Sequence, residues 1–243
     1  MRSTHLSLTF ALFGSLAFAA CGGGSSDDTG DDTGDDATTP DGDTGCQPAT
    51  VLPTAYRPIA EISEGAVAVT TAGGITSGTI DATAGGLSGA ADNPYIYIDL
   101  RSGGMKVAVD DVDALTSTEW DVALKRSSLR ANGGDSGPGN RRIAVVADAV
   151  LADVTAAPAD GYTTDDFADA NCELVTIPGG EPMSAFGEWY LYDEATHEVT
   201  PKPDVYVLER NNGSHVAFRV VTYYGDETMP MRGAYYQVEW KDL

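Results

Sequence analysis

The stretch EWDVALKR at residues 119–126, followed by NGGDSGPG at residues 132–139, decides the fold of this chain. Apolar and polar side chains alternate in its first part, as is typical of a β-strand. The alternation predicts two faces: Trp120, Val122 and Leu124 on one, and Asp121, Ala123 and Lys125 on the other. The second part contains four glycines, which tolerate backbone conformations that other residues avoid, and therefore predicts a turn-rich loop.

The pentapeptide GDSGP at residues 134–138 also resembles the nucleophile loop of chymotrypsin-type serine proteases. That chemistry requires a histidine that accepts the serine proton, and in that family the histidine comes first along the chain. Here only His5 precedes Ser136, in a segment expected to be removed, whereas His197 and His215 follow it. We therefore interpret the pentapeptide as a turn and expect no enzymatic activity.

The N-terminus is typical of an exported bacterial lipoprotein. Residues 1–20 combine Arg2 with a short apolar run, which predicts a signal peptide rather than a membrane-spanning helix. The small residues before Cys21 resemble a lipobox, so we expect Cys21 to be lipidated and to become the mature N-terminus. Ordinary signal-peptidase cleavage, with Cys21 discarded or free, is the alternative. Residues 21–45 are rich in Gly, Ser, Thr and Asp and predict a disordered acidic tether.

Charge and cysteine content limit the partners and the compartment. The chain has 37 acidic and 14 basic residues and a net charge of −23, which disfavours binding to nucleic acid or to anionic lipid head groups. Residues 46–243 remain for one domain of ordinary size. With Cys21 lipidated, Cys46 and Cys172 are left as a disulfide pair in an oxidising compartment; two free buried thiols are the alternative.

Alternation with a period of two recurs along the domain and predicts a mainly β, antiparallel fold with few short helices. The expected strands are residues 95–100, 105–109, 143–149, 188–193, 205–210, 215–224 and 234–240, with a weaker strand pair within 67–89. The turn sequence NNG at residues 211–213 predicts a hairpin. Thr163 and Thr164 precede DDFA and predict one short helix.

Three blocks in a fixed order resemble the HmuY family of haem-binding bacterial lipoproteins, most strongly over residues 95–240. The first is WDVALKR at 120–126, with NGG at 132–134 and SG at 136–137. The second is GEWY at 187–190, with PK at 201–202 and VYV at 205–207. The third is AFRV at 217–220, with YY at 223–224. Their joint order carries the resemblance, because each block alone is weak. It implies an antiparallel β domain of HmuY type over residues 46–243.

The resemblance also implies a haem held between two axial side chains, histidines or methionines, on loops at one end of the sheet. His197 lies near the position expected for the second ligand, and the shortened first-ligand loop offers Met183. We therefore expect His197 and Met183 to bind the haem iron. A turn histidine and a core-filling methionine are the alternative. Haem propionates would pair with cations, and four arginines surround the glycine loop: Arg126, Arg130, Arg141 and Arg142.

Together these patterns predict a cell-envelope lipoprotein, anchored by lipid to the periplasmic or surface face of the outer membrane. It is expected to bind haem or a related tetrapyrrole without catalysis, for haem or iron acquisition. The expected partners are haem or a haem-carrying protein and an outer-membrane receptor, and not nucleic acid. The alternative is a lipoprotein of the same fold that lacks haem ligands and serves as a surface interaction module.

Overall fold

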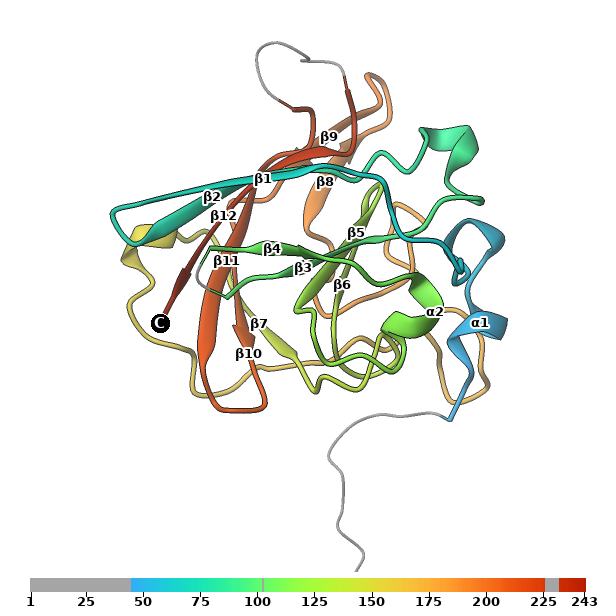
Figure 1. Cartoon of the computed structure of the whole chain (residues 1–243), viewed down its shortest axis with the longest axis horizontal. Coiled ribbons are helices and arrows are strands. Elements are labelled where there is room, and N and C mark those ends of the chain that lie inside the picture. Colours follow the sequence, from blue (N-terminus) through green and yellow to red (C-terminus); the bar gives the residue numbers. More distant parts are fainter. Residues whose placement is uncertain (1–44, 102, 226–231) are drawn as a thin grey trace, which may run out of the picture. The chain divides into compact units, whose positions relative to one another are not determined.

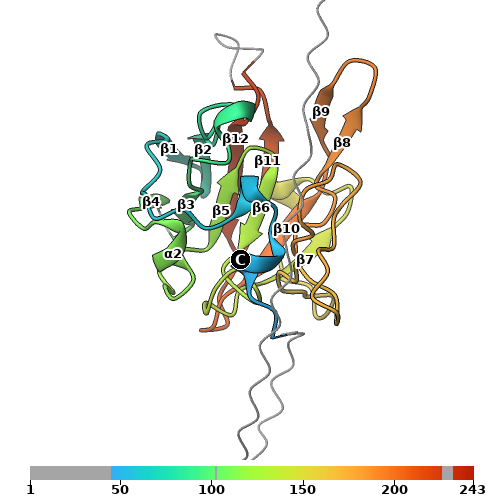
Figure 2. The same ribbon diagram turned by 90° about the vertical axis from the view of Figure 1, so that its right-hand side faces the viewer.

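Two antiparallel sheets form the frame of the domain in a computed structural model, which describes residues 45–101, 103–225 and 232–243 (Figure 1). The six-stranded sheet has the order β1 (Val67–Ala72), β2 (Ile75–Asp81), β12 (Tyr235–Asp242), β11 (His215–Thr222), β10 (Val205–Glu209) and β7 (Arg142–Val146). The four-stranded sheet has the order β4 (Met105–Val107), β3 (Ile96–Asp99), β5 (Val122–Lys125) and β6 (Ser128–Ala131). A separate hairpin pairs β8 (Tyr190–Asp193) with β9 (Glu198–Pro201), and it stands apart from both sheets in Figure 2.

Helices are few and short. They are α1 (Pro48–Val51), α2 (Asp111–Ala114) and the 3₁₀ turns Thr54–Tyr56, Leu87–Gly89 and Leu151–Asp153. Within the described ranges no helix is long and apolar enough to cross a membrane. The expected mainly antiparallel β fold is therefore confirmed, including the strand pair within 67–89, which is the β1–β2 hairpin. The expected signal segment, Cys21 and the tether as far as residue 44 lie outside the described residues.

One apolar core joins the two sheets. Inward-facing residues of the small sheet, such as Ile98, Val122 and Leu124, belong to the same buried cluster as Phe218 and Trp240 of the large sheet. A second cluster covers the outer face of the small sheet, and a third covers the outer face of β10 and β11. Because both faces of β5 are covered, all four of its residues are buried.

The two faces predicted for residues 120–125 needed one correction. Val122 and Leu124 face the shared core as expected, but Trp120 belongs to the opposite cluster, where its ring packs 4.9 Å from that of Tyr97. The prediction was wrong because Trp120 precedes the start of β5, so the alternation of the strand does not extend to it. Its indole nitrogen donates to the Ala114 carbonyl at 3.2 Å.

Asp121, next to Trp120, anchors three distant parts of the chain. Its side chain is 2% exposed and forms ion pairs with Arg141 at 2.9 Å and Arg210 at 2.8 Å, and it accepts the backbone N–H of Leu100 at 3.0 Å. Arg141 also donates to the Gly139 carbonyl in the glycine-rich loop. Burial alone would raise the pKa of Asp121, but the two guanidinium groups outweigh it and lower the pKa below its ordinary value.

A second buried carboxylate, Asp165, occupies the region where a short helix was predicted, and that prediction was wrong. Thr163 pairs in extended conformation with Ile143, and Asp165 forms a bridge to Gly134. The Asp165 carboxylate accepts hydrogen bonds from Ser136 Oγ at 2.5 Å and from the N–H groups of Ala131 and Ala185. These tertiary hydrogen bonds replace the backbone bonds of the predicted helix.

Glycine is required at position 134, where the chain passes Asp165. Gly134 has a φ of 57°, and a Cβ there would lie 2.1 Å from the Asp165 carbonyl oxygen.

The hydrogen bond from Ser136 agrees with the interpretation of GDSGP as a structural turn. Ser136 is buried, its hydroxyl is directed at Asp165, and among the described residues no histidine bonds to it. Burial raises the pKa of Asp165 to about 7, although the hydrogen bonds from Ser136, Ala185 and Ala131 oppose this shift.

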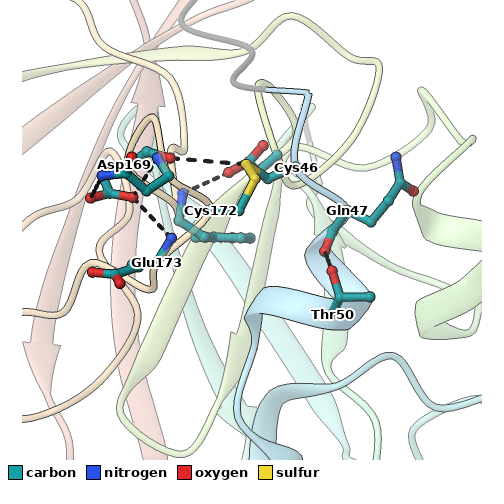
Figure 3. Close-up of a disulfide and its surroundings, with 9 residues drawn as sticks. Cys46, Gln47, Thr50, Asp169, Cys172 and Glu173 are labelled. Carbon is teal, nitrogen blue, oxygen red and sulfur yellow. Dashed lines mark hydrogen bonds between the residues drawn. A yellow bond between two sulfur atoms is a disulfide. The ribbon is translucent and has the colours of Figure 1, made fainter.

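The start of the domain is fastened by the expected disulfide. Cys46 and Cys172 are bonded, with their Cα atoms 5.5 Å apart, so this prediction is confirmed (Figure 3). Cys172 lies in a tight loop with a φ of 60°. The Asp169 side chain holds this loop by accepting the N–H groups of Asn171 and Glu173. The bond closes a loop across 126 positions, for which the loop-entropy model gives a stabilisation of about 4–5 kcal/mol.

We predict that Asp121→Ala lowers the free energy of unfolding by about 3–5 kcal/mol, because it leaves two largely buried arginines without their counter-charge. Urea denaturation at pH 7 measures the loss. Since the pKa of Asp121 is lower in the folded state, its stabilisation is present above the unfolded pKa of about 4 and is lost as the pH falls through the folded value. The matched control is Asp242→Asn, whose exposed carboxylate lies 3.9 Å from Arg210 and should contribute less than about 1 kcal/mol. Equal losses in the two variants would contradict the anchoring role.

We predict that Ser136→Ala destabilises the fold by about 1.5–3 kcal/mol at pH 8 and by less at pH 5. The folded pKa of Asp165, about 7, exceeds the unfolded value, so its stabilisation is full at low pH and is lost as the pH rises through 7. Removing the hydroxyl penalises the charged carboxylate, which dominates at pH 8. Urea denaturation at both pH values tests this. Ser128→Ala is the control, because Ser128 accepts a hydrogen bond from the neutral Tyr95 hydroxyl, and its loss should not change between them. A pH-independent loss in Ser136→Ala would refute the prediction.

Candidate functional site

A cavity of about 730 Å³ lies where four segments meet. They are the β5–β6 turn with Arg126 and Ser127, the loop at 178–181, the β8–β9 hairpin, and residues 223–224 after β11. This volume falls within the range of about 300–1,000 Å³ that is typical of small-molecule sites. A smaller cavity of about 280 Å³ over β1, β2 and β12 is lined mainly by small, aliphatic and hydroxyl side chains and offers no His, Met or Tyr. The larger cavity is therefore the candidate site.

Aromatic side chains form one wall of the cavity. Tyr190 and Tyr223 line it, and Trp189 packs behind them with ring centroids 4.8 Å from Tyr190 and 6.0 Å from Tyr223. Tyr236 completes the cluster at 5.5 Å from Trp189. Trp189 is fixed by a hydrogen bond from its indole nitrogen to the Ser127 carbonyl at 2.8 Å. Such a wall suits a flat, largely apolar ligand.

Glu181 places a buried carboxylate in the cavity wall. One of its oxygens accepts a hydrogen bond from the Tyr190 hydroxyl at 2.5 Å, and the other accepts one from Ser127 Oγ. Burial, followed by the bond to Glu181, raises the pKa of Tyr190 far above its ordinary value, so this hydroxyl stays protonated and donates. The loop approaches closely at Gly179, where a Cβ would lie 2.0 Å from the Tyr190 hydroxyl oxygen.

His197 lines the cavity from the tip of the β8–β9 hairpin. Its backbone has a φ of 59°, in the left-handed region, and its N–H donates to the Asp193 carbonyl at 2.7 Å. The Asp193 side chain accepts the N–H groups of Ala195 and Thr196, which fixes the turn. His197 Nδ1 lies 2.7 Å from the hydroxyl oxygen of Tyr192, and both side chains are largely exposed. The bond orients the imidazole and leaves Nε2 for another partner.

Met183, the second residue expected in the site, is placed differently. It follows the loop at 178–181, its N–H donates to the Val175 carbonyl at 2.8 Å, and its side chain packs half-buried against the core. It is not among the described residues that line the cavity. His215, at the start of β11, also lies outside the cavity, with Nε2 3.9 Å from Glu209. The structure thus brings one of the two expected ligands to the site.

Sequence reasoning missed most of the cavity wall. Tyr192 lies five positions before His197, and this spacing did not predict the hydrogen bond between their side chains. Glu181 and Tyr190 come from different segments and meet through tertiary packing. The block GEWY did indicate that Trp189 and Tyr190 belong together. It did not indicate that they form a cavity wall.

Comparisons with known proteins give one family match and several similar solved structures. The family model described as HmuY protein matches residues 91–236, which is more than half of the chain. No curated protein matches the sequence. Among solved structures, a candidate lipoprotein of Bacteroides fragilis has 20% identity and a TM-score of 0.44, covering 71% of this chain and 91% of its own. A candidate HmuY-like haem-binding protein of Bacteroides vulgatus has 18% identity and a TM-score of 0.43, covering 69% and 91%. The apo HmuY analogue of Tannerella forsythia has 16% identity and a TM-score of 0.44, covering 74% and 98%. On the strength of the family match, this chain belongs to the HmuY family.

Proposed function

We propose that this protein binds haem or a related tetrapyrrole, without catalysing a reaction, in the cavity beside the β8–β9 hairpin. The observation that carries the proposal is His197 in the cavity lining, with Nδ1 held by Tyr192 at 2.7 Å. Histidine is an established ligand of haem iron. The iron of a bound haem would accept the imidazole nitrogen at an axial position. The aromatic wall and the cavity volume also fit a flat macrocycle.

The hydrogen bond between His197 and Tyr192 has a defined role in this proposal. Binding of iron at Nε2 requires that Nδ1 carry the proton and donate it to the Tyr192 hydroxyl oxygen. Histidines that bind metals almost always donate their other ring N–H in this way, which fixes the ring and raises its basicity. Tyr192 is therefore proposed as the positioning residue for His197.

Met183 is proposed as the second axial ligand, and it needs a local movement to reach the iron. We propose that the segment at 178–183 shifts toward the cavity when haem binds, so that this side chain leaves the core. Apolar contacts hold the side chain in place, but the adjoining loop carries Gly179 and Gly180. Loops commonly rearrange when a ligand binds. The packing of Met183 is also the observation that favours the alternative function, an HmuY-fold interaction module without haem ligands.

The family and the N-terminal sequence support a proposal for the cellular setting. We propose a lipoprotein with lipid on Cys21, held at the outer membrane by that lipid, with residues 22–45 as a tether. In this setting the protein captures haem, free or from a haem-carrying protein, and passes it to an outer-membrane receptor for iron acquisition. Cys21 and the tether up to residue 44 lie outside the described residues.

Titration of the purified domain with haem tests the proposal. We expect a shifted Soret band with six-coordinate, low-spin features, which His197→Ala abolishes and His215→Ala leaves intact. Met183→Ala should convert the spectrum to a five-coordinate one. The absence of a Soret shift in the wild type, in both redox states, would contradict the haem proposal and favour the interaction module. A five-coordinate wild-type spectrum that Met183→Ala leaves unchanged removes Met183 from the site but keeps His197.

Tyr192→Phe tests the positioning role. Losing the partner of Nδ1 should lower haem affinity by about 10–100-fold, while the low-spin spectrum persists at saturating haem, because the iron ligand itself remains. Tyr235→Phe, which removes a hydroxyl from a residue outside the cavity, is the matched control. Unchanged affinity in Tyr192→Phe would show that the hydrogen bond does not support iron binding.

A further inference from the structure

We infer that Arg126 binds a carboxylate of the ligand, so that the site selects tetrapyrroles with free acid side chains. The inference rests on the proposed function. It adds to His197 a second contact with the ligand, between the positive guanidinium group of Arg126 and a negatively charged acid side chain. Four arginines lie near the glycine-rich loop in the sequence, and the sequence alone does not show which of them could bind a ligand. Their contacts in the structure distinguish them.

Three of these arginines already have partners. Arg141 is paired with Asp121 at 2.9 Å, and Arg142 with Glu209, where its Nε donates at 2.8 Å. The Arg130 guanidinium stacks 4.1 Å from the Tyr95 ring centroid and 4.7 Å from that of Phe167, and donates to the Tyr56 carbonyl. None of the three lines the cavity.

Arg126 differs from them in both respects. It lines the cavity, and within the part of the chain that the structure describes its buried Nε has no hydrogen-bond partner. Other buried polar atoms without a partner there are Lys125 Nζ, Arg130 Nε and the Tyr162 hydroxyl, on residues that do not line the cavity. An unsatisfied buried donor is costly, and a ligand oxygen would remove that cost.

The backbone holds Arg126 in this place at the expense of strain. It occupies the two-residue turn between β5 and β6 with a φ of 52°, a region that favours glycine. Its carbonyl accepts the Tyr236 hydroxyl at 2.6 Å, which locks the turn to β12. Strained residues of this kind persist where the surrounding structure over-determines them, and they cluster at ligand sites.

The charged residues of the cavity wall determine where a carboxylate of the ligand can bind. Glu181, in the same wall, has its oxygens engaged by Tyr190 and Ser127 and forms no ion pair with Arg126. Its charge would repel a ligand acid, as would the net charge of −23 of the chain. A guanidinium group matches a carboxylate with two parallel hydrogen bonds. Arg126 is therefore the local site that can hold an anionic ligand edge in an acidic protein.

The test compares metal-free protoporphyrin IX with its dimethyl ester, which lacks the free acids, by quenching of tryptophan fluorescence. The variants are Arg126→Gln and Arg126→Gly, with Arg142→Gln as a control of equal charge change outside the cavity. Arg126→Gly relieves the left-handed strain, so loss of binding in it does not reflect failure to fold. We expect both Arg126 variants to bind the diacid about 10–100-fold more weakly and to bind the ester as the wild type does. Arg142→Gln should match the wild type with both probes.

The outcomes separate this inference from the proposed function. If the Arg126 variants bind the diacid as tightly as the wild type, the carboxylate role is overturned, while a Soret shift with haem would still support iron binding by His197. If the diacid requires Arg126 but haem gives no Soret shift, the carboxylate role stands and iron ligation falls. If the wild type binds neither porphyrin, the carboxylate role is overturned, and iron ligation falls with it only if haem also gives no Soret shift.

Discussion

The carboxylate of Asp121 is the interaction on which the rest of the domain depends. Two arginines from distant positions, Arg141 and Arg210, close on it in the protein interior. Arg141 reaches the glycine-rich loop through the Gly139 carbonyl and the β10–β11 turn through Asn211. The first of the sequence blocks that mark the HmuY family therefore supplies the negative charge at which these distant segments meet. Without it the two sheets would share an apolar core but lose the polar lock that fixes their connecting loops.

Asp165 performs a similar task on the other side of the glycine-rich loop. Its three hydrogen bonds join the end of β6, the loop residue Ser136 and the turn at Ala185. Ala185 precedes Trp189 in the chain, and Trp189 in turn bonds to the β5–β6 turn at Ser127. The cavity thus depends in part on the buried polar contacts of Asp165, which lie outside its own lining.

Periodicity predicted strands such as β12, in which every second residue is buried. The sequence NNG marked the hairpin because its residues tolerate the turn. Periodicity failed at Trp120, and the helix-capping pattern failed at residues 163–168, because tertiary contacts override local preference there. The cavity was less accessible to prediction. His197 was found through the family resemblance, but its contact with Tyr192 depends on side-chain positions within a turn. Met183 was chosen by residue type, and residue type does not distinguish a ligand from a core side chain.

The disulfide has a mechanical consequence. Cys46 is covalently joined to the loop that carries Cys172, and the whole segment from residue 47 to residue 171 lies inside the closed ring. Tension applied to the chain before residue 46 therefore passes across the sulfur–sulfur bond directly into the loop held by Asp169. The short α1 helix and the β1–β2 hairpin bear none of that load and cannot be peeled from the sheet in sequence. A pull on this terminus thus meets a covalent clamp before it can unravel any strand.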